Sequence, residues 1–192
     1  MLNEFVAMGD SFTEGIGDEI DGVSLKSWVE YFALLHEPKL KYTNLAKRGL
    51  LTKEIREQQL TKALALEPSM VSLIAGANDV LKGKWNSKEY KIEMEYMIDS
   101  LSKTGAKILI ANLPDFTFRL PLRLPQKQLV QAQLVEANQI IQSLSAKYEF
   151  IHFNFWDHPL TKEKTFWSKD RIHPNSKGYL EVANIIYKQL LA

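Results

Sequence analysis

Cysteine is absent from the 192 residues of this chain, and its absence excludes several kinds of chemistry. A chain without thiols has no disulfide framework, no thiolate nucleophile and no cysteine-ligated zinc site. Any nucleophile must therefore be an oxygen or a lysine.

Long hydrophobic runs are also lacking. No stretch approaches the roughly 18 apolar residues that a membrane-spanning helix needs. Residues 1–8 carry no basic segment, and their apolar run is too short for a signal peptide. We therefore expect a cytoplasmic protein with no transmembrane segment.

An excess of charge of one sign is missing as well, since 24 Lys and Arg face 23 Asp and Glu. This balance indicates no nucleic-acid partner. The hydrophobic content of 45% is ordinary for a globular protein, and no repeat or linker divides the chain. We predict a single domain over residues 1–192, and nothing in the sequence indicates an oligomeric state.

Short apolar runs typical of buried strands alternate with helical patterns along the chain. The runs span residues 5–8, 41–44, 70–75, 107–111 and 150–153. Apolar residues recur at helical spacing over about 24–36, 52–66, 90–101, 130–144 and 179–190, with Ser24 and Thr52 as expected N-caps. This pattern predicts an α/β fold, a parallel sheet covered by helices on both faces, with ligands at the carboxyl ends of the strands.

A serine follows the first strand, in the block from Gly9 through Asp10 and Ser11 to Gly15. At such a strand end the hydroxyl can point into a cleft, and neighbouring backbone N–H groups can face an anion. A helix-capping role explains a serine there equally well.

An acid and a base lie three residues apart near the C-terminus, at Asp170 and His173. One turn can hold the carboxylate on one imidazole nitrogen while the other nitrogen faces the serine, as in a catalytic triad. A solvent-exposed loop histidine is the plainer interpretation of His173 taken alone.

Two further loops supply candidate hydrogen-bond donors. Asn78, after the third strand, can donate its side-chain amide to an oxyanion, and the backbone of Gly49 can approach a substrate closely. Asn44 and Arg48 are alternatives to Gly49 in the second loop.

Taken in order, these four blocks resemble those of the SGNH, or GDSL-type, hydrolase family of esterases and lipases. The resemblance spans residues 9–178, and the first block has Phe12 where the family name has leucine. It implies Ser11 as nucleophile, His173 as base oriented by Asp170, and an oxyanion hole made by the Ser11 and Gly49 N–H groups with the Asn78 amide. It also implies a three-layer α/β/α fold with five parallel strands in flavodoxin-like order, and neither a metal nor an organic cofactor.

The function that follows is a serine esterase that hydrolyses carboxylic esters through an acyl-serine, as a lipase, lysophospholipase or deacetylase, on a small-molecule or lipid ester. One alternative is a non-catalytic flavodoxin-like phosphate-binding or regulatory domain, with Gly15 to Gly17 as the phosphate loop. Another is an inactive hydrolase fold that acts through protein contacts.

Substrate-binding residues are expected after the fourth strand, where apolar and other residues alternate. The apolar members Phe116, Phe118, Leu120, Leu122 and Leu124 would form one side of an extended segment. That side could wall an acyl site, with Arg119 and Arg123 meeting a phosphate or carboxylate. Packing over the core or at a subunit contact accounts for the pattern as well, and Trp156 and Trp167 could line the same entrance or be core residues.

Other titratable residues fit less well. His158 directly follows Asp157, and adjacent residues in an extended loop point apart. His36 and His152 fall within a predicted helix and strand. No metal-ligand spacing occurs, and we interpret Asp18, Glu19 and Asp21 as a solvated acidic loop.

Overall fold

The structure is a computed structural model that describes residues 4–20, 22–156 and 158–191. Its centre is a five-stranded sheet in the order β2-β1-β3-β4-β5, and every neighbouring pair of strands is parallel. The strands are β1 (Glu4–Gly9), β2 (Lys41–Asn44), β3 (Met70–Ile74), β4 (Lys107–Ala111) and β5 (Ile151–Phe153). The predicted parallel sheet and its flavodoxin-like strand order are confirmed.

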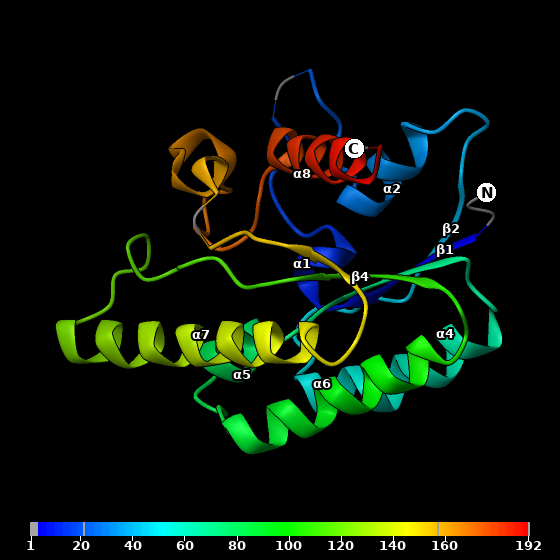
Figure 1. The fold of residues 1–192 in the computed structure, drawn as a ribbon. Helices are drawn as coiled ribbons and strands as arrows, with labels where there is room; N and C mark the ends of the chain where they lie inside the picture. Colours follow the sequence, from blue (N-terminus) through cyan, green and yellow to red (C-terminus); the bar gives the residue numbers. More distant parts are fainter. Residues whose placement is uncertain (1–3, 21, 157, 192) are drawn as a thin grey trace.

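Helices cover both faces of the sheet (Figure 1). On one face lie α2 (Trp28–Leu34) and α8 (Ser176–Leu191), and on the other lie α4 (Thr61–Ala65), α6 (Ser87–Ser102) and α7 (Leu124–Ser145). The shorter elements are α1 (Ser11–Glu14), α3 (Thr52–Ile55), the π-helical turn η1 (Arg56–Leu60), α5 (Ala77–Leu81) and the 3-10 turns η2 (Pro159–Lys162) and η3 (Lys164–Phe166). The fold is thus the predicted three-layer α/β/α arrangement.

Alternation along the strands builds a separate core on each face. In β1, Val6 and Met8 pack toward α6 and α7, whereas Phe5 and Ala7 pack toward α2 and α8. All four side chains are fully buried, because successive residues of a strand point to opposite faces and both faces are covered. This is why the central strands appear in the sequence as continuous apolar runs.

Two of the expected helix starts are wrong. Ser27, not Ser24, caps α2, and its hydroxyl accepts the Glu30 N–H at 3.1 Å. Thr52 is the first residue of α3 rather than its cap, and its N–H and hydroxyl both donate to the Asp79 carboxylate, at 3.0 and 2.9 Å. The side chain of Asp79, from α5, therefore takes over the capping role that the sequence assigns locally.

The segment after β4 is also not the extended strip that the alternation suggests. A turn at residues 117–119 folds it back, and α7 begins at Leu124 with Pro125 in its first turn. Phe116 is buried at 5% exposure while Phe118 and Leu124 are 49% and 67% exposed, so the apolar residues do not share one face.

Register places the functional loops together. Gly9 pairs with Ile74 and Ala7 with Asn44, so the carboxyl ends of β1, β2 and β3 meet at one edge of the sheet. The loops that carry Ser11, Gly49 and Asn78 therefore start from neighbouring points. In the described part of the chain, none of the helices has the length and apolar character required to cross a membrane.

Candidate active site

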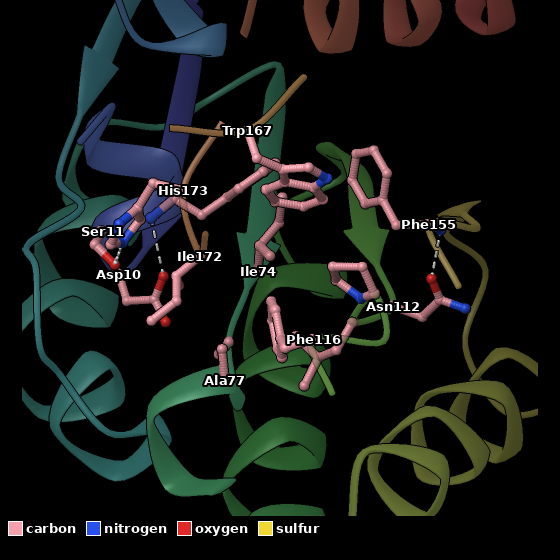
Figure 2. Close-up of a pocket in the computed structure, with 14 residues that line it drawn as sticks. Asp10, Ser11, Ile74, Ala77, Asn112, Phe116, Phe155, Trp167, Ile172 and His173 are labelled. Carbon is pink, nitrogen blue, oxygen red and sulfur yellow. Dashed lines mark hydrogen bonds between the residues drawn. The ribbon is translucent and has the colours of Figure 1, made fainter. Parts of the chain in front are cut away.

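Ser11 is the first residue of α1, directly beyond β1, and is half-buried. The turn before it is tight: a Cβ on Gly9 would lie 2.7 Å from the Thr13 hydroxyl and 2.8 Å from the Ile74 carbonyl oxygen. Only glycine fits this approach, because real Cβ atoms are not found at such distances. The serine can therefore sit at the strand end with its hydroxyl facing the pocket (Figure 2).

His173 connects this serine to an acid 159 residues along the chain. Its Nε2 lies 2.8 Å from the Ser11 Oγ, and its Nδ1 lies 2.5 Å from the Asp170 Oδ2. Because a carboxylate only accepts, Nδ1 carries the hydrogen, which leaves Nε2 to accept the Ser11 O–H. The structure brings Ser11, His173 and Asp170 into one hydrogen-bond series (Figure 2 shows Ser11 and His173).

The Asp170 carboxylate is fixed by its own turn. Its Oδ1 accepts the backbone N–H groups of Ile172 and His173, at 2.9 and 3.0 Å. Partial burial acts to raise the pKa of Asp170, but the hydrogen bonds from the ring and backbone of His173 outweigh it and hold that pKa below its usual value. The acid therefore stays ionised beside the ring.

Asn78 lies close to the serine turn, but its amide is occupied. Its Nδ2 donates to the Asp10 Oδ2 at 3.1 Å and to the Leu50 carbonyl at 3.0 Å. It follows Gly76, which adopts a left-handed φ of 114° at the end of β3. Asn78 and Gly49 are not among the residues that line the described pocket beside Ser11.

Gly49 differs from its two competitors in what its donors do. The Asn44 amide donates to the Thr13 carbonyl at 2.7 Å, and the Arg48 N–H donates to the Glu14 carboxylate at 2.6 Å. Within the described residues, no protein acceptor is recorded for the Gly49 N–H, and its φ of 79° favours glycine. The backbone N–H of Gly49 is thus free to bind an oxyanion, whereas that of Arg48 already donates to Glu14.

Asp10 and Gln59 make contacts near Ser11 that the sequence did not predict. Asp10 is almost fully buried, and burial raises its pKa to about 6, although its carboxylate also accepts the Phe12 N–H at 3.2 Å. Gln59, buried in η1, donates to the Gly9 carbonyl and accepts the Gly9 N–H, each at 2.9 Å. Both side chains hold the backbone that leads into Ser11.

A small apolar pocket of about 40 Å³ opens beside the serine and the histidine. Its walls include Ile74, Ala77, Leu113, Phe116, Phe155 and Trp167 (Figure 2). Of the five apolar residues expected to wall an acyl site, Phe116 lines this pocket, Phe118 lines the next groove, and Leu124 begins α7 outside both. Leu120 packs against the core, and Leu122 is half-buried outside the pocket.

The remaining candidates lie elsewhere. His158 accepts the Leu160 N–H, and His36 contacts the Phe32 carbonyl. Asp21 and Asp157 lie outside the described residues. Trp156 packs against the core, whereas Trp167 lines the pocket.

The glycine loop considered for phosphate is filled by protein. A Cβ on Gly17 would lie 2.1 Å from the Pro174 carbonyl oxygen. The described residues contain no group of three or more His, Cys, Asp or Glu able to hold a metal ion.

A three-layer parallel sheet with this series at its carboxyl edge is the arrangement used by a class of hydrolases that act on esters. The GDSL-like lipase/acylhydrolase family model matches residues 7–180, so the chain belongs to that family. It is accordingly an ester-bond hydrolase, which sets aside the interpretation as a phosphate-binding or regulatory domain.

Solved structures agree on the fold. A lipase/acylhydrolase from Enterococcus faecalis superposes with a TM-score of 0.78 at 19% identity, over 98% of this chain and 95% of that chain. A psychrotrophic esterase from Pseudoalteromonas sp. superposes with a TM-score of 0.71 at 16% identity, over 98% of this chain and 97% of that chain. A variant of an acetyl xylan esterase from Geobacillus stearothermophilus superposes with a TM-score of 0.72 at 16% identity, over 98% of this chain and 94% of that chain. No curated protein sequence matches the chain.

Proposed function

We propose that this hydrolase is a serine esterase in which Ser11 attacks the ester carbonyl and forms an acyl-enzyme. The observation that carries the proposal is the hydrogen-bond series from Ser11 through His173 to Asp170, with its 2.8 and 2.5 Å contacts. It contains a nucleophile, a base within reach of its proton, and an acid that orients the base.

In the first step the Ser11 Oγ bonds to the carbonyl carbon as His173 Nε2 takes its proton. The C–O bond to the alcohol then breaks, and the alcohol leaves with that proton. In the second step His173 deprotonates water and the water oxygen adds to the acyl carbon. The bond to Ser11 then breaks to release the acid, and His173 returns its proton to the Ser11 Oγ. Asp170 stabilises the imidazolium formed in each half-reaction.

The oxyanion that develops in both steps needs donors in a fixed place. We assign this role to the N–H groups of Ser11 and Gly49 and to the Asn78 amide. Asn78 reaches the site only if an oxyanion replaces one of its present acceptors, Asp10 or Leu50. Gly49 needs no such exchange.

The size of the pocket favours a short acyl group. At about 40 Å³ this pocket is far smaller than the neighbouring groove of about 570 Å³, so it suits a short acyl group such as acetyl, and a long chain needs movement of the walls. The likeness to the acetyl xylan esterase, and to a family 3 carbohydrate esterase from Clostridium thermocellum, supports the same choice among lipase, lysophospholipase and deacetylase.

A fluorophosphonate probe and a series of esters test the proposal. The probe should label Ser11 alone, and Ser11→Ala should lose both labelling and turnover while its melting temperature is retained. Acetyl esters should be hydrolysed faster than octanoyl esters of the same alcohol. Labelling at another serine, or undiminished turnover in the alanine variant, would overturn the assignment of the nucleophile.

A further inference from the structure

A second and larger cavity adjoins the apolar pocket, and Trp167 lines both. Its volume is about 570 Å³, against about 40 Å³ for the pocket beside Ser11. We call it the cationic groove, because five of the residues that line it are basic: Arg119, Lys162, Lys164, Lys169 and Arg171. Among the described residues, no acid is part of its lining.

The basic side chains of the groove have no acidic partners. Some lysines elsewhere are paired, as in Lys26 with Glu30 and Lys147 with Glu95, although not every lysine outside the groove is. Within the described part of the chain, none of the five groove residues takes part in an ion pair. Five like charges around one concavity focus a positive potential into it.

Arg119 is the most unusual of the five. Its guanidinium carbon lies 3.2 Å from the centre of the Trp167 ring and 5.1 Å from that of Phe118. Its three guanidinium nitrogens are buried, and each lacks a hydrogen-bond partner among the described residues. Burial accordingly lowers the pKa of Arg119 to about 10. A buried charge without a counter-charge is costly, and a nearby anion would offset that cost.

The two acids whose charges act on Arg119 are Asp115 and Asp170, and both accept hydrogen bonds from other groups. The Asp115 carboxylate accepts the N–H and hydroxyl of Thr117, at 2.8 and 2.6 Å, as well as the Gln131 amide. Asp170 is held by His173 and by the turn around it. Burial lowers the pKa of Arg119 by more than the charges of these two carboxylates raise it, so they offset the positive charge only in part.

Arg171 connects the groove to the catalytic turn. It lies between Asp170 and Ile172 with a left-handed φ of 64°, which is uncommon for a residue with a side chain. Its guanidinium donates to the Arg119 carbonyl at 3.5 Å, and its side chain lines the groove. A group bound there would therefore lie next to the turn that carries His173.

We propose that the cationic groove binds a phosphate group on the alcohol part of the ester. This inference rests on the proposed serine esterase. The acyl group belongs in the small apolar pocket, and the larger groove is the space left for the alcohol. Arg171 and the exposed lysines contact the phosphate, while the Arg119 charge beneath the aromatic lining adds to its attraction.

Matched pairs of esters test this in two arms, because such a phosphate can belong to a soluble alcohol or to a lipid headgroup. The soluble arm compares 1-acetylglycerol 3-phosphate with monoacetylglycerol, and the lipid arm compares a 1-alkyl-2-acetylglycerol 3-phosphate with the corresponding 1-alkyl-2-acetylglycerol, so that the acyl group is acetyl throughout. We expect about tenfold higher kcat/KM for the phosphorylated member of at least one pair at low ionic strength, falling as salt screens the groove. The arm that shows it identifies the source, and equal rates in both arms overturn the proposal.

Charge-removing variants localise the effect. Lys164→Gln combined with Lys169→Gln should reduce the preference for the phosphorylated ester about fivefold while hydrolysis of the neutral ester is kept, since each exposed charge pair contributes up to about 1 kcal/mol. The matched control is Lys62→Gln with Lys188→Gln, two exposed lysines outside the groove, which should change the preference less than twofold. Equal effects of the two double variants would show a general field effect and overturn the groove assignment.

A binding measurement separates this proposal from the proposed function. Glycerol 3-phosphate should bind the catalytically inactive Ser11→Ala variant in calorimetry, and the added pair of groove substitutions should weaken that binding severalfold. Binding of this kind without turnover of any ester would overturn the esterase and support the groove. Turnover of neutral esters with no detectable binding of glycerol 3-phosphate would do the reverse.

Discussion

The two sides of Ser11 are built differently. On the proton-transfer side, His173 and Asp170 already make the contacts that catalysis requires, at 2.8 and 2.5 Å. On the oxyanion side, the Asn78 amide donates to Asp10 and Leu50 instead of facing the pocket. One half of the proposed machinery is therefore complete in the free protein, and the other half depends on an exchange of hydrogen bonds.

This difference indicates which contacts a substrate must alter. The proton-transfer side needs no rearrangement, whereas the oxyanion must compete with a buried carboxylate for the same donor. Hydrogen bonds that are absent in the free enzyme and form in the transition state raise kcat more than they lower KM. Four variants test the comparison, from the largest expected effect to the smallest.

Loss of the base should cost most. His173→Ala should lower kcat by about 10⁴-fold or more, because removal of one triad member disables the whole unit. The control is His158→Ala, which should change kcat less than about threefold, since His158 only accepts the Leu160 N–H. Steady-state kinetics on an acetyl ester checks both, and the reverse ranking would exclude His173 as the base.

Asn78→Ala tests the oxyanion side. We expect kcat to fall by about 10² to 10³ with little change in KM, the usual cost of one oxyanion donor. A rise in KM at constant kcat would instead mean that Asn78 binds the ground state. Since Asn78 also contacts Asp10 and Leu50, a melting curve must accompany the kinetics to identify any loss due to unfolding.

Gln59→Leu tests the support that both sides share. It leaves the buried N–H and carbonyl of Gly9 without their side-chain partner, and we expect a loss of about 2 to 4 kcal/mol in the free energy of unfolding. A lower kcat, by roughly tenfold, should follow because the turn into Ser11 is less fixed. Gln58→Leu, exposed on the same helix, is the control for both measurements. If the two variants behave alike, Gln59 does not position the turn.

Asp10→Asn should show itself in the pH dependence of stability. A carboxyl whose pKa rises from 3.8 to about 6 on folding binds its proton more tightly in the folded state, so the stability it contributes at low pH is lost as the pH rises through 6. Removing the charge should abolish that loss, by up to about 3 kcal/mol above pH 7. Denaturant unfolding between pH 4 and 7 measures the slope.

Asp99 provides an internal check on the sign. The hydrogen bond from Lys103 lowers the pKa of Asp99, so its contribution is gained as the pH rises and is lost in acid. Asp99→Asn should therefore change the slope in the opposite sense to Asp10→Asn, and only below about pH 4, because the pKa of Asp99 lies under its ordinary value of 3.8. The unfolding series for this pair of proteins extends down to about pH 2. Parallel slopes for wild type and Asp10→Asn would show that Asp10 does not titrate as proposed.

Much of the framework could be predicted because it depends on local patterns. Strands buried on both faces are continuous apolar runs, and the predicted runs at 70–75 and 107–111 correspond to β3 and β4. The parallel sheet then brings the loops after its strands to one edge. That rule is enough to place Ser11, Gly49 and Asn78 near one another before any coordinates exist.

The remainder depends on contacts between distant residues, for which the sequence has no local signal. Gln59 is one polar residue in a helical pattern, and nothing near it shows that its amide meets Gly9, 50 residues away. The same holds for Asp10 with Asn78 and for Asp79 with Thr52. The wrong prediction of an extended segment over residues 116–125 could have been avoided from the sequence alone. Pro125 is typical of a first helical turn and marks the start of α7.

The contact between Gly17 and Pro174 has a consequence for the order of folding. Residues 16–20 are joined to residues 168–179 by three hydrogen bonds. The Asp18 N–H donates to the Ser168 hydroxyl, the Ser176 N–H donates to the Asp18 carbonyl, and the Tyr179 hydroxyl donates to the Ile16 carbonyl. These bonds close loops of 150 residues and more, and a loop of that length is slow to form because so many chain conformations must be given up. During refolding, Ser11 can reach its strand end early, but His173 arrives only when this closure occurs. Recovery of activity should therefore follow the return of most secondary structure, as a late step in the refolding time course.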